Sequence, residues 1–208
     1  MIITHFGKQF FKIQQGEMVV ALDPVSRESK SGINARFGAD VAFVSTNHPD
    51  YNGTDQLVYG DREPFVVRGP GDYEVKEIFI KGVLSTGISK PKKYVNTIYW
   101  FTVDGINICF LGALSDANLS KEALESITEP DILFVPVGGE TVLDAKAAAK
   151  LASSLEPKLI IPMGFDANSL KAFLKEIGQE KAESMDKITL KRKDLEGKEG
   201  EVVVLEAI

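Results

Sequence analysis

The sequence contains very little of the residues that usually build metal sites and disulfides, with two histidines and one cysteine among 208 residues. The single cysteine, Cys109, excludes an internal disulfide, and its apolar neighbours indicate a small buried side chain. No stretch approaches the roughly 20 apolar residues that a membrane-spanning helix needs. The N-terminus begins with strand-like sequence and lacks the basic and then apolar pattern of a secretory signal. We therefore expect a cytoplasmic protein with no membrane partner.

An excess of basic residues is also missing. Lys and Arg number 24 against 30 Asp and Glu, so the net charge is −6 at pH 7 and nucleic acid is not an expected partner. The composition, 44% apolar and 26% charged, is that of an ordinary globular protein. No repeat or low-complexity linker divides the chain, so we expect one domain over residues 1–208. Its partner is expected to be an unknown small molecule or a protein, and homo-oligomerisation stays open.

One stretch, residues 41–52, joins an apolar strand to a polar cluster. Residues 41–44 are apolar and rich in β-forming types, and Ser45, Thr46, His48, Asp50 and Tyr51 follow almost at once. Proteins of the α/β class usually place their chemistry at the carboxyl ends of buried strands. The sequence therefore predicts a functional loop at this point.

The two halves of the chain predict different secondary structure. The first half is strand-rich, with hairpins at Gly16 and at Asp104-Gly105 and consecutive antiparallel strands near residues 65–67, 73–75, 78–84 and 97–103. The second half predicts helices from Asn118 or Ser120 to 127, over 142–155 and over 167–177, and strands over 132–137 and 159–163. Residues 188–191 and 201–205 resemble a closing hairpin. An α/β (α+β) arrangement of two facing mixed sheets with helices outside satisfies this pattern.

Five framework segments carry a resemblance to a known family: residues 3–7 (ITHFG), 23–24 (DP), 69–75 (GPGDYEV), 131–139 (DILFVPVGG) and 160–163 (IIPM). In this order they resemble the metallo-β-lactamase superfamily, and within it the small branch of zinc-dependent hydrolases related to ascorbate-6-phosphate lactonase. The resemblance covers nearly the whole chain. It implies a four-layer αββα sandwich and, in the family, a metal-dependent hydrolase.

The metal-ligand positions of that family are mostly altered in this chain. The family signature Thr/Ser-His-x-His-x-Asp-His matches residues 45–51, in which only the second histidine and the aspartate, His48 and Asp50, remain. The remaining matched positions carry residues other than the family's ligands: Lys8, Thr46, Tyr51, Gly87, Phe110, Ala113 and Gly164. Zinc needs three or four N, S or O ligands. We therefore expect no cofactor, and the alternative is one weakly bound divalent metal such as Zn on His48 and Asp50.

Several of these residues allow two interpretations. His48 and Asp50 form either a residual half-site or a locally hydrogen-bonded turn. Asp23 is either a carboxylate that lines the site or a turn residue. Lys8 is either a solvated hairpin lysine or the cation that compensates Asp23 and Asp50 in place of a metal. The pair at residues 138–139 is either an anion cradle or a tight turn.

Three functions from different classes follow from this pattern. The first is a catalytically degenerate, non-catalytic binding or assembly module whose former site Tyr51, Phe110 and Phe165 fill at least in part. The second is a metal-dependent hydrolase of a small lactone, phosphorylated sugar or related ester. The third is a metal-free hydrolase in which Asp50 or His48 is the general base and Tyr51 a proton donor. The sequence favours the first and leaves open whether the protein is an enzyme.

Overall fold

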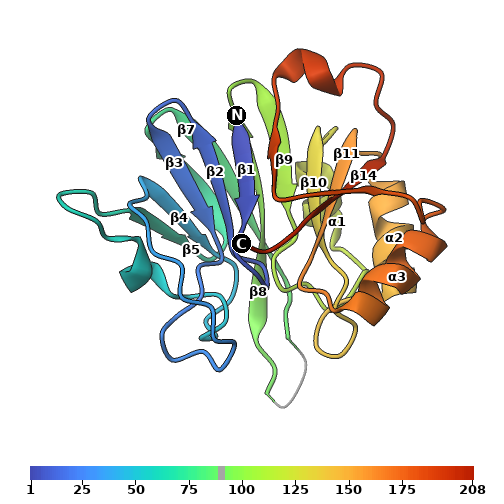
Figure 1. Cartoon of the computed structure of the whole chain (residues 1–208), viewed down its shortest axis with the longest axis horizontal. Coiled ribbons are helices and arrows are strands. Elements are labelled where there is room, and N and C mark those ends of the chain that lie inside the picture. Colours follow the sequence, from blue (N-terminus) through green and yellow to red (C-terminus); the bar gives the residue numbers. More distant parts are fainter. Residues whose placement is uncertain (89–91) are drawn as a thin grey trace.

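Two β-sheets face each other in the computed structural model, which describes residues 1–88 and 92–208 (Figure 1). The six-stranded sheet contains β1 (Ile2–His5), β2 (Phe11–Gln15), β3 (Met18–Leu22), β4 (Val41–Val44), β5 (Phe65–Arg68) and β13 (Lys187–Thr189). The eight-stranded sheet contains β6 (Gly71–Val75), β7 (Ile78–Thr86), β8 (Val95–Val103), β9 (Ile106–Phe110), β10 (Ile132–Pro136), β11 (Leu159–Met163), β12 (Glu183–Met185) and β14 (Glu201–Leu205). Their orders are β13-β1-β2-β3-β4-β5 and β12-β14-β11-β10-β9-β8-β7-β6. Both sheets are mixed, as predicted.

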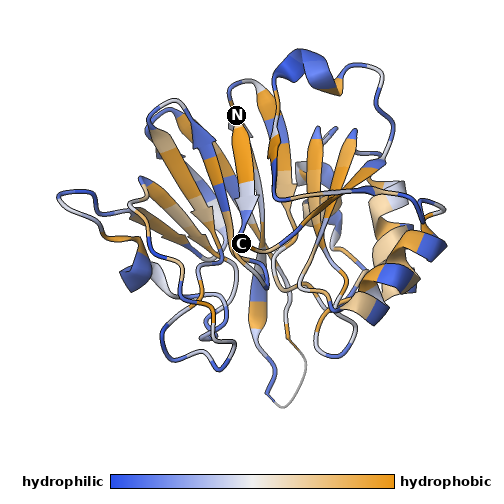
Figure 2. Cartoon of the chain, in the orientation of Figure 1, coloured by the Kyte–Doolittle hydropathy of each residue, from blue (hydrophilic) through white to orange (hydrophobic). Residues whose placement is uncertain are grey.

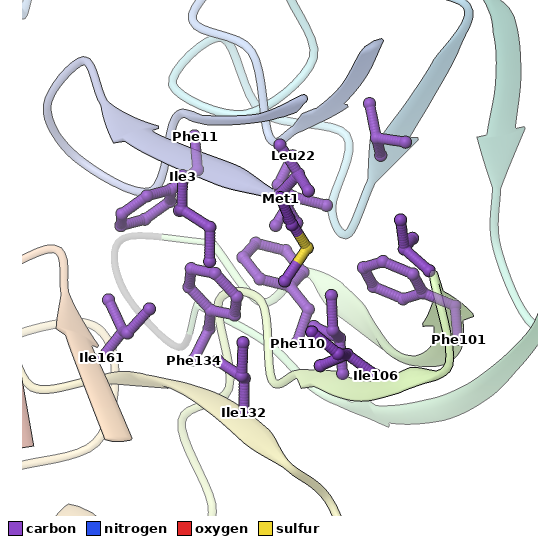
Figure 3. Packing of buried hydrophobic residues seen from close by; sticks show 14 of the residues in the cluster. Met1, Ile3, Phe11, Leu22, Phe101, Ile106, Phe110, Ile132, Phe134 and Ile161 are labelled. Atoms are coloured by element: carbon purple, nitrogen blue, oxygen red, sulfur yellow. The ribbon is translucent and has the colours of Figure 1, made fainter. Parts of the chain in front are cut away.

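The main core lies between the two sheets. Figure 3 shows side chains of the first sheet, among them Phe11, directed at side chains of the second, among them Phe110 and Phe134. The Phe11 and Phe134 rings meet edge to face with their centroids 5.0 Å apart, and Phe43 stacks on Tyr99 at the same separation of 5.0 Å. Aromatic pairs of this kind add about 0.5–1.5 kcal/mol to the burial of their area. The apolar colour of the strands in Figure 2 follows this interior.

Three helices cover the outer face of the eight-stranded sheet. They are α1 (Lys121–Ser126), α2 (Ala145–Ser154) and α3 (Ala167–Glu176), and each begins where a side chain caps its first turn: Ser120, Asp144 and Asp166 respectively. Their apolar residues form a second core with the outward residues of β9, β10 and β14. The predicted helices over 142–155 and 167–177 are therefore present, and the first of these begins at residue 145 because Asp144 caps it.

The outer face of the six-stranded sheet is covered differently. The segment of residues 23–40 and the 3₁₀ turn η1 (Thr54–Leu57) pack there against Phe10, Val19 and Ala42. Within residues 1–88 and 92–208, no α-helix covers this face. The two mixed sheets of the predicted fold class are confirmed, with the helices gathered on one side. None of the helices in the described parts of the chain has the length and apolarity that a membrane crossing requires.

The predicted pairing of two segments is wrong. The last strands form no hairpin, because β13 pairs with β1 while β14 pairs with β11 and β12 in the other sheet. Four of the five residues of β14 are buried and serve both cores, which a surface hairpin would leave exposed. Strand β5 pairs in parallel with β4 instead of with the strand that follows it. Strand β4 pairs in parallel with β3 on one edge and with β5 on the other, and all four of its residues are buried, as is usual for strands within parallel sheets. The hairpins at Gly16 and Asp104-Gly105 are confirmed.

Candidate functional site

A cleft with a volume of about 470 Å³ opens where the loops after three strands meet the turn between β1 and β2. Its lining includes Lys8 and Gln9 from that turn, Tyr51 after β4, Gly138 after β10, and Gly164 and Phe165 after β11. Because β10 and β11 are parallel, their carboxyl ends reach the same edge of the sheet. Of the polar cluster after β4, Tyr51 lines the cleft, whose volume is within the range of small-molecule sites.

Asp50 lies beside this cleft and has a cation next to it. The ammonium Nζ of Lys8 is 3.2 Å from Oδ2 of Asp50, and the hydroxyl of Ser29 donates to Oδ1 at 2.5 Å. Burial by itself would raise the pKa of Asp50, but the Ser29 hydrogen bond and the Lys8 charge outweigh it and hold this pKa below its usual value. Asp50 is therefore an ionised, fully engaged carboxylate at neutral pH.

His48 makes the local hydrogen bond that a turn interpretation expects. Its Nδ1 accepts the backbone N–H of Asp50 at 3.2 Å, so one of its two ring nitrogens is occupied by the loop itself. The ring lies edge-on to Tyr94 with centroids 5.3 Å apart. His48 and Asp50 are thus adjacent, and Nδ1 of His48 and both carboxylate oxygens of Asp50 already have partners within the protein.

Two of the replaced ligand positions are tied into the surrounding structure. The hydroxyl of Thr46 donates to the carbonyl of Val95 at 2.7 Å. Tyr51 is 6% exposed and packs with Ala113 and Val142 in a small apolar cluster. Burial, reinforced by the nearby charges of Asp23 and Asp50, raises the pKa of Tyr51, so its hydroxyl is neutral at pH 7. Neither residue offers the charged oxygen that would replace an imidazole ligand.

Asp23 occupies a separate, fully buried niche behind the loop. Its Oδ1 accepts the backbone N–H of Ser45 at 2.7 Å and its Oδ2 accepts the Ser45 hydroxyl at 2.6 Å. Burial raises the pKa of Asp23 to about 8, although both Ser45 hydrogen bonds oppose the change. Gly112 closes this niche, since a Cβ at that position would lie 2.4 Å from the Cβ of Ser45. Lys8 contacts Asp50 but forms no ion pair with Asp23 in the described chain.

Phe110 does not join Phe165 at the site, contrary to expectation. Phe110 lies on the inner face of β9 in the core between the sheets, with its ring centroid 5.9 Å from that of Phe134. Phe165 lines the cleft together with Tyr51. The expectation that Phe110 fills the former site is therefore wrong, because strand alternation directs this side chain inward. The cleft remains open.

The glycine pair before α2 is a tight turn. A Cβ at Gly138 would lie 2.3 Å from the carbonyl oxygen of Gly164, so the two loops of the cleft touch at their backbones. Gly139 has φ of 81° and donates its N–H to the carbonyl of Leu143 at 3.1 Å. This N–H is used within the turn, which favours the turn interpretation over an anion cradle.

Sequence reasoning missed three polar residues that shape the site. Ser29 lies in the irregular segment of residues 23–40, yet its hydroxyl reaches Asp50. Asn96 is fully buried, and its side chain bonds to the Ser85 hydroxyl, the Leu111 carbonyl and the Ala113 N–H, each at 2.8 Å. Gln9 is 1% exposed, and neither its amide nitrogen nor its amide oxygen has a hydrogen-bond partner. Asn96 could have been identified from the sequence, because it is a polar residue inside a largely apolar strand.

The zinc site that the resemblance implies does not fit these residues. Among residues 1–88 and 92–208 there is no group of three or more His, Cys, Asp or Glu side chains that could hold a metal ion. Ala113 and Gly164 supply no donor atom, and the Thr46 hydroxyl is engaged with a backbone carbonyl. Zinc is bound by three or four N, S or O ligands at about 2.0–2.3 Å. The donor set present here falls short of that number.

The chain is similar to known proteins over its whole length. A family model described as the β-lactamase superfamily domain matches residues 2–164. A solved structure from Thermotoga maritima, a candidate zinc-dependent hydrolase of the metallo-β-lactamase superfamily, is 31% identical with a TM-score of 0.76, covering 99% of this chain and 98% of its own.

Two more distant solved structures share the fold. A candidate metal-dependent hydrolase from Parabacteroides distasonis is 19% identical with a TM-score of 0.64, covering 85% of this chain and 89% of its own. Igni18, a metallo hydrolase from Ignicoccus hospitalis, is 17% identical with a TM-score of 0.62, covering 91% of this chain and 99% of its own. The family match over most of the chain, together with the Thermotoga relative, shows that this protein belongs to the metallo-β-lactamase superfamily.

Proposed function

We propose that this protein is a non-catalytic member of the superfamily that binds a small molecule or a protein segment in its cleft without a metal. The observation that carries the proposal is the contact between Lys8 and Asp50, whose charged atoms are 3.2 Å apart. Asp50 is one of two residues that keep the type of a family ligand, and an ammonium group neutralises it. A cation supplied by the chain itself removes the electrostatic reason for a metal at this position.

The remaining contacts support the same proposal. His48 uses Nδ1 within its own turn, and Gly164, which has no side chain to offer a metal, has φ of 64° in the left-handed region that glycine adopts readily. The cleft nevertheless persists at about 470 Å³, with polar and apolar walls suited to a ligand. We propose a small molecule or protein partner rather than nucleic acid or a membrane, because the net charge is −6.

The two hydrolase alternatives have weaker support. A metal-dependent hydrolase is favoured by the Thermotoga relative, which is described as a candidate zinc-dependent enzyme. A metal-free hydrolase would use Asp50 as its base, but a carboxylate whose pKa is lowered is a weak proton acceptor. The hydroxyl of Tyr51 would then be the donor, and burial makes this phenol a weaker acid than in water.

The deciding experiment measures metal content and metal affinity in the same preparation. Full-length protein purified without chelator is analysed for bound metals and then titrated calorimetrically with Zn²⁺ and with Mn²⁺. We expect less than one tenth of an equivalent of metal per chain and no saturable binding below the millimolar range. In the matched variant Lys8→Ala the Asp50 carboxylate loses its ammonium partner, so detectable Zn²⁺ binding should appear or increase. One tightly held metal per chain in the wild-type protein, with hydrolysis of lactone or phosphate ester substrates, would overturn the proposal.

A further inference from the structure

The two sheets have four end strands, and β5 differs from the other three. Proteins usually protect such strands with charged side chains, because the unpaired edge of a sheet associates readily with another chain. The other three end strands, β6, β12 and β13, carry exposed charged side chains: Asp72 and Glu74, Glu183, and Lys187 respectively. Strand β5 begins instead with Phe65, Val66 and Val67, and the Phe65 side chain is 52% exposed.

The surroundings of β5 are also apolar. The charged residue of the strand, Arg68, donates from its guanidinium to the hydroxyl of Thr54 at 3.1 Å, so its charge is held toward η1. On the loop that leads into β5, Val58 and Tyr59 are 43% and 76% exposed. Exposed apolar side chains that gather at one place indicate a surface that another chain covers.

The backbone of β5 leaves every second residue without a partner. The N–H of Phe65 donates to the carbonyl of Asp40 at 2.9 Å, which directs it toward β4. In a parallel pair the N–H and C=O of one residue point to one side and those of the next residue to the other. Val66 and Arg68 therefore point away from β4, where the described chain has no further strand. The Arg68 carbonyl oxygen lies 3.2 Å from the Tyr73 hydroxyl and has a second lone pair free.

A second copy of β5 can pair with these groups. If it runs antiparallel with the two Val67 residues opposite each other, Val66 of each copy faces Arg68 of the other. Residues placed in this way exchange both of their backbone hydrogen bonds. Two such pairs form by symmetry, so every N–H and C=O that Val66 and Arg68 direct away from β4 has a partner. The edge is therefore complementary to itself.

The side chains agree with this register. Phe65 lies opposite Gly69 of the second copy, which has no side chain to obstruct the ring. A similar pairing of β6 about Tyr73 would set Asp72 opposite Glu74 of the second copy, and like charges in opposite positions destabilise a sheet. Of the two end strands on this side of the molecule, β5 is thus the one that suits a second copy.

We propose that β5 is a dimerisation edge, at which two copies of this chain join antiparallel through Val66 and Arg68 and extend the six-stranded sheet across both copies. The occupant of this edge is a second copy because the free groups and the side chains fit their own symmetry mate. No residue of β5 lines the cleft, so the interface is separate from the proposed binding function. The pairing is short, and we expect a dissociation constant of roughly 10–100 µM.

The first test measures the oligomeric state of the full-length protein by sedimentation velocity from about 2 to about 500 µM, which spans the expected constant. The wild-type protein should change from monomer to dimer over this range. Phe65→Lys introduces a charge like those on the other end strands and should raise the dissociation constant at least about tenfold. Leu124→Lys is the matched control, because Leu124 is also 52% exposed but lies on α1, and it should dimerise like the wild type. A protein that stays monomeric at every concentration would overturn the proposal.

The second test identifies the edge by amide hydrogen exchange. At about 500 µM the Val66 and Arg68 amides should exchange at least about tenfold more slowly in the wild type than in Phe65→Lys. The Val67 amide points toward β4, so its protection in Phe65→Lys shows that β5 stays in the sheet. Val66→Pro is a second variant, since proline is tolerated where an edge N–H faces solvent, and it should weaken the dimer at least about tenfold. A dimer whose Val66 and Arg68 amides exchange as fast as in Phe65→Lys uses another surface and refutes the proposal.

Discussion

Two carboxyl groups near the loop after β4, Asp23 and Asp50, have different surroundings, and their pKa values shift in opposite directions. Asp23 is fully buried with only the neutral groups of Ser45 beside it, and its pKa is raised to about 8. Asp50 is partly exposed and has the ammonium of Lys8 next to it, and its pKa is lowered. The Ser29 hydrogen bond and the Lys8 charge thus keep Asp50 ionised at neutral pH, whereas burial favours the protonated form of Asp23.

This difference shows that the electrostatics of the two sites are set by different neighbours. The Asp50 niche contains an ion pair at the edge of the cleft, where water still reaches Lys8. The Asp23 niche contains a carboxyl group whose pKa is raised by burial. Gly112 packs closely against Ser45 and closes this niche. The contributions of Asp23 and Asp50 to the free energy of unfolding should therefore change in opposite directions with pH. Mutations at the two residues should also change this free energy by different amounts.

The largest expected effect is on the pH dependence of stability. A folded-state pKa raised from 3.8 to about 8 means that Asp23 contributes stability that is complete below pH 4 and is lost as the pH rises to about 8. The slope can reach about 1.4 kcal/mol per pH unit. Urea denaturation at pH 5, 6, 7 and 8 measures it, and Asp23→Asn should flatten the curve because the neutral amide does not ionise and its oxygen can still accept a Ser45 hydrogen bond.

The control for this measurement is Asp55→Asn, which changes an exposed carboxylate. It should leave the slope between pH 5 and 8 as in the wild-type protein. Parallel stability curves for wild-type and Asp23→Asn would show that the two niches do not differ as described.

Removal of the buried carboxyl group should have the next largest effect. Asp23→Ala leaves the Ser45 N–H and hydroxyl without partners and opens a small cavity, so the free energy of unfolding should fall by about 3 kcal/mol. The measurement is urea denaturation at pH 6, where the wild-type carboxyl group is largely protonated. A loss below about 1 kcal/mol would mean that Asp23 does not hold the loop after β4 in place.

A smaller effect is expected at the ion pair. Lys8→Met removes the cation beside Asp50, which should destabilise the protein by about 1 kcal/mol because Lys8 is partly solvated. The pKa of Asp50, followed by carboxyl ¹³C NMR, should rise toward its usual value. The matched control is Lys121→Met in the exposed Lys121 and Glu125 pair, which should have almost no effect. If the pKa of Asp50 stayed unchanged in Lys8→Met, the Lys8 contact would have no electrostatic effect on Asp50.

The smallest effect is expected at the hydroxyl group that faces Asp50 from the other side. Ser29→Ala removes one hydrogen bond to the carboxylate and should lower the free energy of unfolding by about 0.5–1 kcal/mol. It should also raise the pKa of Asp50, since this hydrogen bond favours the charged form. The same ¹³C titration checks it, and a pKa shift larger than that of Lys8→Met would reverse the ranking of the two partners.

Much of the fold could be predicted from the sequence because its signals are local. The hairpins at Gly16 and Asp104-Gly105 require positive φ, and the three helices begin at side chains that can cap them. The pairing of β5 and β14 could not be predicted, because each strand joins a neighbour that is distant in the sequence or parallel to it. Such pairings depend on which buried strand still has a free edge when the sheet assembles. The local sequence of a strand does not contain this information.

The site divides in the same way. The identities at residues 46, 51, 113 and 164 already predicted that several ligands of the family are missing, since a side chain that is absent cannot be restored by folding. Only the tertiary structure decided that Lys8 reaches Asp50, that Ser45 encloses Asp23, that Phe110 faces the core and that Gln9 is left unpaired beside Gly164. Each of these depends on distances between segments far apart in the chain, and pKa values and hydrogen bonds are set by those distances rather than by residue type.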